Sequence, residues 1–369
     1  MKKNSNGSED KQRQARGRGS RGRRKVLEQA VSIGIDLGDR RSRYCALNEA
    51  GEVIEEGEFA NTRAGIERLF AARSRTRVAL ETGGQSGWIA REISGWGQEV
   101  LVANARELRG IWGGPRKNDR RDAEKLARYA RLDPKLLHPT RVRSAAGQRE
   151  LSRLRVRDAL VRTRTLLVNT ARGLSKAHGE RIGPVSTKTF ARRARASLSS
   201  ETAAILEPLL EQIEALSARI AEADRAIEQA AKNDVEAARL TTVHGVGALT
   251  ALTFVRTLED PGRFRNSRDV GAYLGLTPGQ AQSGERDPQL GISKAGDVRL
   301  RRLLVQCAHY ILGPFGRDSA LRRWGLELAR RGGVAGRNRA VIAVARKLAV
   351  MLHRMWVRGE NWRPFPAGA

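Results

Sequence analysis

Short apolar runs separated by turns dominate residues 29–140, and segments with helical spacing lie between them. Strands are predicted at Val31–Leu37, Arg43–Leu47, Val53–Phe59, Arg77–Glu81 and Gln98–Ala103. Helices are predicted at Thr62–Ala72, at about Gln85–Ser94 and at Asp119–Arg131. Asn61 is the expected N-cap of the first helix, because its side-chain oxygen can accept a hydrogen bond from the first turn.

The order of these elements indicates the fold class. Three consecutive strands followed by helix, strand, helix, strand and helix is the order of the α/β ribonuclease-H-like (RuvC-like) fold. We therefore expect one such domain at residues 29–140. Residues 1–28 precede it and contain almost no apolar side chains, which is typical of a disordered basic tail. The tail would act as a non-specific nucleic-acid arm or only as a solvated spacer.

A seven-residue repeat of apolar side chains predicts a helical coiled-coil linker at residues 141–235. In the first helix the repeat comprises Leu160, Leu167 and Leu174, with Val161 and Val168 beside them. In the second helix one heptad position holds Leu206, Ile213, Ile220 and Ile227, and the position three later holds Leu209, Leu216, Ala223 and Ala230. The first helix is rich in Arg and the second in Glu, so the two could form an antiparallel hairpin. We favour a coiled coil that pairs two subunits, with an intramolecular strut as the alternative.

Residues 236–369 are expected to form a second globular domain, mostly helical and punctuated by glycines. A glycine-apolar-glycine turn precedes the apolar run Ala248–Val255, which is the helix-hairpin-helix pattern. Backbone N–H groups of Gly245 and Gly247 could then approach a phosphate at the helix N-terminus. A turn that only joins two helices is the alternative.

Two serines lie in polar, glycine-rich stretches of this domain, Ser283 and Ser293. A serine hydroxyl is a poor nucleophile unless a base or a metal activates it. Serines in such loops are usually solvated or form turns, so the residue pattern alone favours neither as a nucleophile. A dense basic cluster follows, made of Lys294, Arg299, Arg301 and Arg302.

The C-terminal segment predicts a basic amphipathic helix. Arg337 and Arg339 stand at its head, and Arg346, Lys347 and Arg354 follow within the run Ala340–Met355. We expect a phosphate-contacting surface there, with a solvated polar face as the alternative.

Charge narrows the class of partner. The chain has 369 residues, with 69 Lys and Arg against 40 Asp and Glu and a formal net charge of +29. Because the basic residues run along the whole chain, nucleic acid is the expected partner, rather than anionic lipid or solvent alone. Two distant cysteines, Cys45 and Cys307, form no disulfide framework or metal spacing. With no apolar run long enough to span a bilayer, we expect a cytoplasmic, nucleoid-associated protein without membrane contact.

Four acids carry the candidate chemistry: Asp36, Glu81, Asp119 and Asp122. Asp36 and Glu81 close two predicted strands, and the other two lie three residues apart at the start of a helix, just after Lys117. Such positions can converge on one point. Converging carboxylates repel one another unless cations neutralise them, and an all-oxygen set suits Mg²⁺ or Mn²⁺. In so basic a protein, this predicts metal-dependent phosphodiester chemistry.

Taken together, these motifs resemble the DEDD transposases of bacterial insertion sequences, relatives of the Piv-type DNA invertases. In the first half the resemblance rests on Gly34-Ile35-Asp36, Leu80-Glu81-Thr82-Gly83 and Lys117-Asn118-Asp119-Arg120-Arg121-Asp122-Ala123. In the second half it rests on Gly245-Val246-Gly247, Ala272-Tyr273-Leu274-Gly275-Leu276-Thr277-Pro278, Gln282-Ser283-Gly284 and Ile292-Ser293-Lys294-Ala295-Gly296. The ordered combination is more specific than any single motif.

The resemblance implies a mechanism and partners that composition does not show. The four acids would bind Mg²⁺ or Mn²⁺, and Ser283 would be the nucleophile that forms a phosphoserine link to DNA. Lys294 or Arg299 could balance charge near that serine. The family places the acids of one subunit opposite the serine domain of another, in dimers that assemble into a tetramer on donor and target duplexes. A structured non-coding bridge RNA would pair with both DNAs and guide the recombinase.

Two other functions remain open on these residues. A metal-dependent junction endonuclease would use the same acids to activate water, and Ser283 would then be dispensable. A protein that only organises RNA or DNA would need no converging acids. A covalent protein–DNA intermediate distinguishes the recombinase from both.

Overall fold

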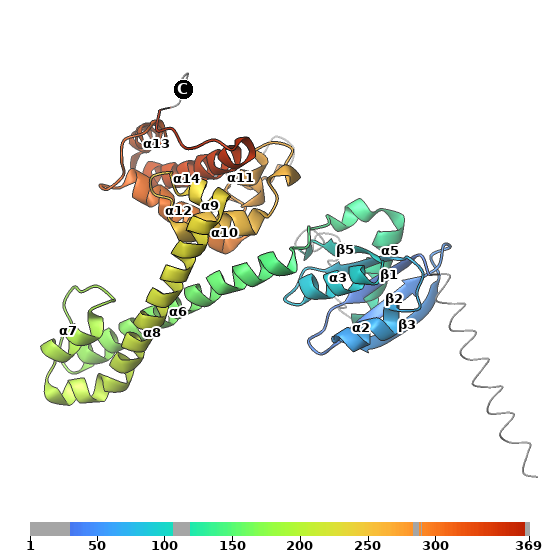
Figure 1. The fold of residues 1–369 in the computed structure, drawn as a ribbon, viewed down its shortest axis with the longest axis horizontal. Coiled ribbons are helices and arrows are strands. Elements are labelled where there is room, and N and C mark those ends of the chain that lie inside the picture. The colour runs from blue at the N-terminus through green and yellow to red at the C-terminus, as the bar shows by residue number, and fades with distance from the viewer. Residues whose placement is uncertain (1–29, 106–118, 283–287, 289, 366–369) are drawn as a thin grey trace, which may run out of the picture. The chain divides into compact units, whose positions relative to one another are not determined.

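The computed structural model describes residues 30–105, 119–282, 288 and 290–365, without the side chains of residues 119, 120 and 334. The predicted tail at 1–28, Lys117 and Ser283 lie outside these residues. The chain divides into two compact units, Met1–Ala145 and Ala146–Ala369 (Figure 1). The predicted helical linker thus falls almost wholly within the second unit.

The first unit contains one five-stranded sheet. Its strands are β1 (Ser32–Asp36), β2 (Arg41–Leu47), β3 (Val53–Ala60), β4 (Arg77–Glu81) and β5 (Glu99–Ala103). Their order in the sheet is β3-β2-β1-β4-β5, and β1 is antiparallel to β2 but parallel to β4. β4 is parallel to β5. All five predicted strands are confirmed, with boundaries within about two residues.

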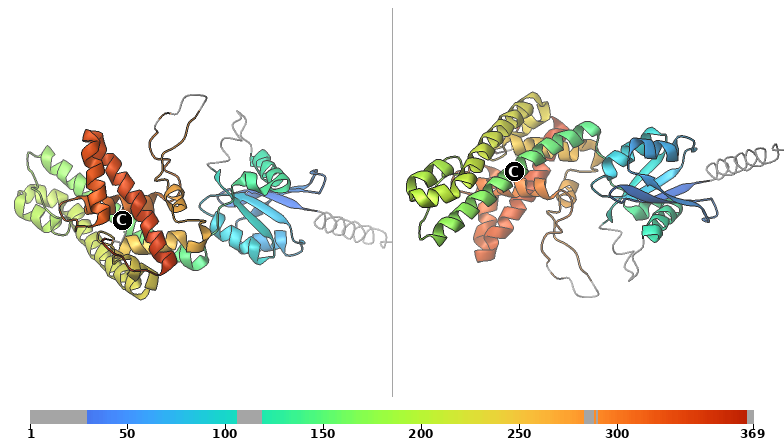
Figure 2. Two further views of the ribbon diagram at one scale, coloured as in Figure 1. Left: turned by 90° about the horizontal axis from the view of Figure 1, so that it is seen from above. Right: turned by 90° about the horizontal axis from the view of Figure 1, so that it is seen from below.

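Helices cover both faces of this sheet (Figure 2). On one face, alternate residues of β1 and β4 such as Ile33 and Leu80 pack with α2 (Arg63–Phe70) and α3 (Ser86–Gly95). On the other face, Ala79 of β4 packs with α5 (Asp119–Leu132). The α/β class expected for the N-terminal segment is therefore confirmed.

The contact between β1 and α5 is unusually close. A Cβ atom on Gly34 would lie 1.9 Å from the backbone oxygen of Ala123 and 2.4 Å from the nitrogen of Ala127. Only a residue without a side chain lets the helix backbone approach the strand this closely. Gly34 therefore sets how near the first turns of α5 come to the end of β1.

Replacing Gly34 with alanine is expected to destabilise the first unit by about 3 kcal/mol, because neither backbone can move without disturbing the sheet or the helix. The loss would appear as a lower midpoint in thermal or urea unfolding. Gly95→Ala is the matched control, since a Cβ there meets nothing within 4 Å. Equal midpoints for the two variants would contradict the close packing of α5 on β1.

The predicted cap of α2 is wrong by one residue. Thr62 has extended backbone angles and its Oγ1 accepts a hydrogen bond from the Gly65 nitrogen at 3.1 Å. Asn61 instead contacts β2 and the loop after β1: its Oδ1 accepts from Ser42 Oγ at 2.6 Å, and its Nδ2 donates to the Gly38 oxygen at 2.8 Å. A side chain already used in these contacts is not available to cap the helix.

The second unit begins with a pair of long helices, α6 (Ala145–Ala177) and α8 (Ser200–Asn233), with α7 (Phe190–Ser197) between them in sequence. Arg157 Nε donates to Asp224 Oδ1 at 2.8 Å. Seven residues further along α6 and seven earlier on α8, Arg164 Nη1 donates to Ser217 Oγ at 3.2 Å. This opposite progression shows that the two helices run antiparallel.

The apolar stripe of α8 is buried within the chain. Its members Leu206, Ile213, Ile220 and Ile227 are all buried, as the heptad predicts. Leu206 and Ile213 pack with Val168 and Ala171 of α6 and with α7. The stripe is thus buried within the chain, as the intramolecular alternative expects, and pairing of subunits stays a prediction.

On α6 the predicted stripe is confirmed only in part. Val168 is buried and Leu167 packs against the same core, whereas Leu174 is 43% exposed. Other buried residues of the helix include Leu151, Leu154 and Ala171. Several registers of apolar residues run along this helix, and its contacts with α8 and the helices beyond decide which one is buried. The periodicity of α6 alone does not contain that information.

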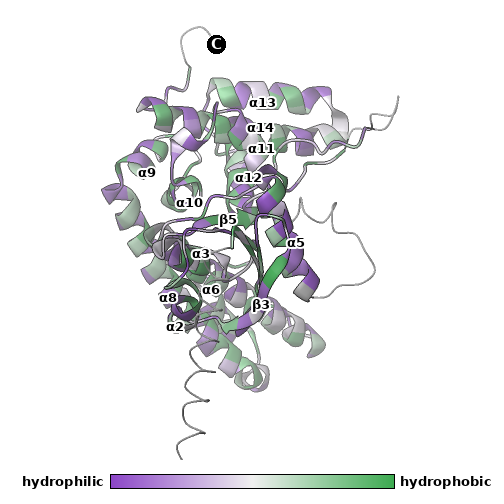
Figure 3. Cartoon of the chain, turned by 90° about the vertical axis from the view of Figure 1, so that its right-hand side faces the viewer, coloured by the Kyte–Doolittle hydropathy of each residue, from purple (hydrophilic) through white to green (hydrophobic). Residues whose placement is uncertain are grey.

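The rest of the second unit is helical. It comprises α9 (Val235–Leu240), α10 (Ala248–Leu258), α11 (Asp269–Tyr273), α12 (Val298–Leu312), α13 (Ala320–Arg331) and α14 (Gly333–Arg358). Hydrophobic and hydrophilic residues alternate along α13 and α14 (Figure 3). The buried side of α14, including Val344, Leu348 and Leu352, shares one core with α10 and α12. In the part of the chain that the structure describes, no helix has the length and apolar character needed to cross a membrane.

Candidate active site

Two of the predicted acids end neighbouring strands. β1 and β4 are parallel, and their register pairs Ile35 with Leu80. Asp36 and Glu81 are the next residue on each strand, so they lie side by side at the carboxyl edge of the sheet. Adjacent strands are about 4.8 Å apart. Both residues are partly exposed, which leaves them accessible from that edge.

Both acids belong to the sheet face that α5 covers. Side chains alternate along a strand, so Asp36 shares a face with Gly34, and Glu81 with Ala79. Gly34 faces the backbone of α5, and Ala79 packs against Leu126 and Ala130 of that helix. Asp36 and Glu81 therefore occupy the α5 side of the sheet.

The direction of α5 brings the remaining acids to the same edge. Arg77, at the start of β4, donates from Nη1 to the Ala130 oxygen near the end of α5, at 3.1 Å. Gly34, further along its strand, meets Ala123, which comes earlier on the helix. The helix therefore runs opposite to β1 and β4, and its first turn lies at their carboxyl ends. That turn holds Asp119 and Asp122.

The side chain of Asp122 is described, whereas for Asp119 only the helical backbone is. Asp122 is 16% exposed in its side chain, and its Oδ1 lies 3.7 Å from Lys125 Nζ. Across the described side chains, no group of three or more His, Cys, Asp or Glu is arranged to hold a metal ion. The side chain of Asp119 is not among those described, so it is not included in this statement.

The donor chemistry at this edge fits a hard divalent cation. Every predicted ligand is a carboxylate, and the structure brings their three elements to one edge of the sheet. Oxygen-only donor sets suit Mg²⁺ and Mn²⁺ and disfavour softer metals. The acids therefore stay predicted ligands of such a cation, placed on elements that meet at one edge of the sheet.

Sequence reasoning missed two side chains that fix the loop after β1. Gln85 Nε2 donates to the Asp39 oxygen at 2.6 Å, and Asn61 Nδ2 donates to the Gly38 oxygen. These hydrogen bonds attach the loop that follows Asp36 to the segment after β4 and to the residue after β3. The available signal was a polar residue shortly after β3 and another after β4. Their hydrogen-bond partners are 22 to 47 residues away in the sequence, so no local pattern identifies them.

In the second unit, the two predicted turn glycines have different surroundings. Gly245 has a positive φ of 92°, and a Cβ there would come within 3.1 Å of Ile311 and Tyr310 of α12. Gly247 is exposed at the N-cap of α10, with open space around it. Packing thus explains Gly245, and Gly247 is the one whose backbone faces outward.

Arg301 is not a surface contact as predicted. It is 8% exposed, and its Nη1 donates to the backbone oxygens of Leu274 and Ala295. These bonds join α12 to two loops, so the side chain is structural. Arg302 is exposed but pairs with Asp158 of α6 at 2.9 Å.

The remaining predicted basic residues differ in burial. Burial lowers the pKa of the Arg299 guanidinium from its ordinary value, against the opposing charge of Asp158. None of its side-chain nitrogens has a hydrogen-bond partner among the described residues. Lys294 is exposed, with a positive φ of 55°. Arg337 and Arg339 are exposed in the first turns of α14, as the sequence predicts.

Comparison with known proteins gives a consistent picture along most of the chain. A family model described as a transposase, of the DEDD type, matches residues 33–177. A second, described as the transposase IS116/IS110/IS902 family, matches residues 237–320. The first match contains the four acids, and the second contains Ser283.

Curated relatives match almost end to end. A probable family 20 transposase of Pseudomonas aeruginosa is 30% identical over 340 residues, covering 90% of this chain and 98% of its own. The transposase for insertion sequence element IS1111A of Coxiella burnetii is 29% identical, covering 92% of this chain and 93% of its own. That for IS1328 of Yersinia enterocolitica is 32% identical, covering 75% and 82%.

Proposed function

Because the chain belongs to the IS116/IS110/IS902 family of transposases, it is an enzyme that cuts and rejoins DNA, and we propose that it does so through a phosphoserine intermediate on Ser283. The single observation that carries this proposal is the edge of the sheet at which β1 and β4 end in Asp36 and Glu81 and the first turn of α5 begins. Its chemistry suits phosphate transfer.

The fold of the first unit supports the proposal. We assign it to the ribonuclease-H-like, RuvC-like class, on the basis of the strand order β3-β2-β1-β4-β5 with only β2 antiparallel to its two neighbours. The described helices α2, α3 and α5 cover the two faces of the sheet. Ligands of open α/β sheets bind at the carboxyl edge of the parallel strands.

The four acids would hold Mg²⁺ or Mn²⁺. A bound divalent ion supplies positive charge that polarises the scissile phosphate and offsets the charge that develops on its oxygens. The chain's own contribution is to keep the carboxylates fixed on two strands and one helix. The tight packing at Gly34 holds that helix against the sheet.

Ser283 would carry the covalent step. Its Oγ loses a proton and forms a bond to phosphorus, while the bond from phosphorus to the DNA 3′ oxygen breaks and that oxygen takes up a proton. The phosphodiester energy is retained in the serine ester. Attack by another DNA 3′-hydroxyl then reverses the step and rejoins the strands, with no need for ATP.

We further propose that a structured non-coding RNA selects donor and target DNA, and that dimers assemble into a tetramer on the two duplexes. The net charge of +29 supports contact with several polyanionic strands at once. Sequence would then be read by base pairing with the RNA, and the protein would contact mainly backbone and shape.

A denaturing gel tests this proposal. The protein is incubated with labelled DNA, cognate RNA and Mg²⁺, then denatured and compared with a sample containing EDTA. We expect a labelled band at the mass of protein plus DNA that forms only with the metal. Nicked DNA without that band would indicate a junction endonuclease that uses water, and neither product would indicate a protein that only binds.

A further inference from the structure

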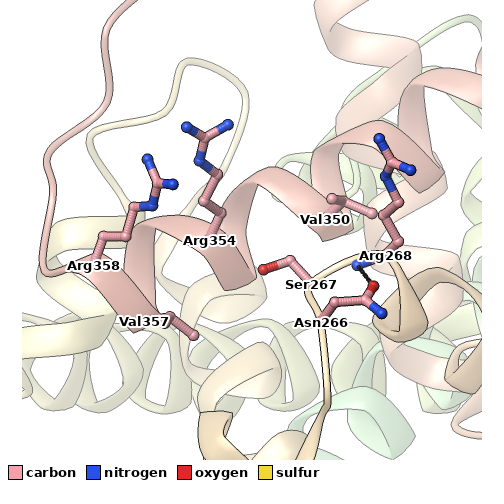
Figure 4. Close-up of a pocket in the computed structure, with 7 residues that line it drawn as sticks. All are labelled: Asn266, Ser267, Arg268, Val350, Arg354, Val357 and Arg358. Carbon is pink, nitrogen blue, oxygen red and sulfur yellow. Dashed lines mark hydrogen bonds between the residues drawn. The ribbon is translucent and has the colours of Figure 1, made fainter.

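A basic cavity lies in the second unit, between α14 and the loop that precedes α11 (Figure 4). It has a volume of about 460 Å³. The side chains of Arg354 and Arg358 extend next to each other from α14, and Arg268 stands across the opening from them. The other lining residues are Asn266, Ser267, Val350 and Val357. No acid is among these lining residues, so the charged side chains that line the cavity are all positive.

Among the described residues, these arginines make one ion pair inside the unit, and it is a long one. Elsewhere in the same unit, Arg323, Arg330 and Arg331 each pair with a carboxylate within 3.1 Å. Neither Arg268 nor Arg354 has a carboxylate within 4 Å in the described part of the chain, and the nearest for Arg358 is Glu360 at 3.9 Å. Like charges that line one cavity disfavour one another, and an external anion would relieve this.

The loop on the far side of the cavity is held rigidly. His353 Nε2 must donate to the Pro261 oxygen at 3.0 Å, because a carbonyl can only accept. Burial lowers the pKa of His353, which favours the neutral ring, so its Nδ1 accepts from Ser267 Oγ at 3.0 Å. Phe264 packs edge-on against the same ring, with centroids 5.2 Å apart.

A second contact shapes this loop next to the arginine. Asn266 Oδ1 accepts a hydrogen bond from the backbone nitrogen of Arg268 at 3.0 Å. The nearest acid on the loop, Asp269, is turned to the backbone nitrogen of Asn266 at 3.2 Å. Arg268 is therefore presented by a fixed loop, with its charge unopposed at the cavity.

Phosphate is the ligand that this chemistry recognises. Guanidinium groups bind phosphate oxygens in a fork that matches their geometry. Val350 and Val357 give the cavity apolar patches of the kind that a sugar can cover. No aromatic ring lines it, whereas sites for single strands stack bases on aromatic side chains. The lining thus favours the backbone of a duplex.

We propose that Arg268, Arg354 and Arg358, which belong to the second unit, bind the phosphodiester backbone of duplex DNA. The inference rests on the proposed function in one respect, namely that DNA is the nucleic acid the protein binds. This site would position a duplex and contribute affinity without reading sequence, since phosphate contacts carry no base information.

Binding of a duplex DNA of 30 base pairs to the full chain tests the site, in EDTA and over a series of salt concentrations. Arg354→Gln combined with Arg358→Gln removes two phosphate contacts. We expect the affinity at 100 mM salt to fall at least ~10-fold, and the slope of log K against log salt to become shallower by about 1.8. Both side chains are exposed, so the variant should melt like the unmodified protein.

Arg330→Gln combined with Arg331→Gln is the matched control. It makes the same change in net charge, in the same unit, at arginines that already pair with Glu327. Equal affinities and slopes for the two double variants would overturn the proposal, as would a loss confined to duplex RNA of the same length. If the unmodified protein failed to bind the duplex, the DNA substrate of the proposed function would fail with it. Normal DNA binding by every variant would rule out this phosphate site and leave the proposed function unaffected.

Discussion

Replacing Asp36 with asparagine is expected to lower the rate of DNA cleavage by about 10³-fold, a loss typical of removing one key electrostatic group from an active site. Asparagine keeps the size of the side chain but removes the charge that would help to bind the divalent ion. Asp36 lies at the carboxyl end of β1, next to Glu81 and on the α5 face. The measurement is the single-turnover rate of strand cleavage in Mg²⁺.

The fold and duplex binding should survive this change. Asp36 is partly exposed, and lowering the negative charge at a cluster of acids should not weaken the sheet. Asp39→Asn is the matched control, because Asp39 is an exposed acid three residues later. We expect the control to cleave within about twofold of the unmodified protein. If Asp36→Asn cleaved DNA at the same rate as the control, Asp36 would have no role in the reaction.

Replacing Ser283 with alanine is expected to abolish the covalent protein–DNA product and to lower strand exchange by about 10⁴-fold or more. Removal of a nucleophilic serine leaves only what binding and charge stabilisation supply. The acids are untouched, so metal binding and duplex affinity should be unchanged. The measurement is the yield of recombined DNA and of covalent adduct in one reaction.

Ser293→Ala provides the matched control for this variant. Ser293 lies ten residues later, is exposed, and its Oγ accepts only a long hydrogen bond of 3.5 Å from the Ala295 nitrogen. It should recombine DNA at close to the normal rate. If Ser283→Ala still nicked DNA at the normal rate, water would be the nucleophile and the enzyme would act as a nuclease.

Much of the first unit could be predicted from the sequence. Its strands are short apolar runs between turns and helices, so each could be located from its own residues. Once β1 and β4 are taken as parallel neighbours, Asp36 and Glu81 must share an edge, and Gly34 must face a helix. The positions of these residues follow from the strand pattern once the pairing of β1 with β4 is known.

Other features depend on contacts between distant residues and could not be predicted. The buried face of α6 is chosen by α8 and by the core of the second unit, not by its own leucine repeat. Arg301 looks like a surface cation in sequence, but its acceptors are carbonyls of Leu274 and Ala295. The cavity at Arg268 brings together residues about 90 positions apart, and no local pattern connects them.

Mapping the covalent bond tests the central claim most directly. The adduct formed with DNA, cognate RNA and Mg²⁺ is digested with nuclease and protease, and the modified peptide is sequenced by mass spectrometry. We predict a nucleotide joined through phosphate to Ser283 and to no other residue. A nucleotide on a different side chain, or complete cleavage and rejoining without any modified peptide, would contradict the account.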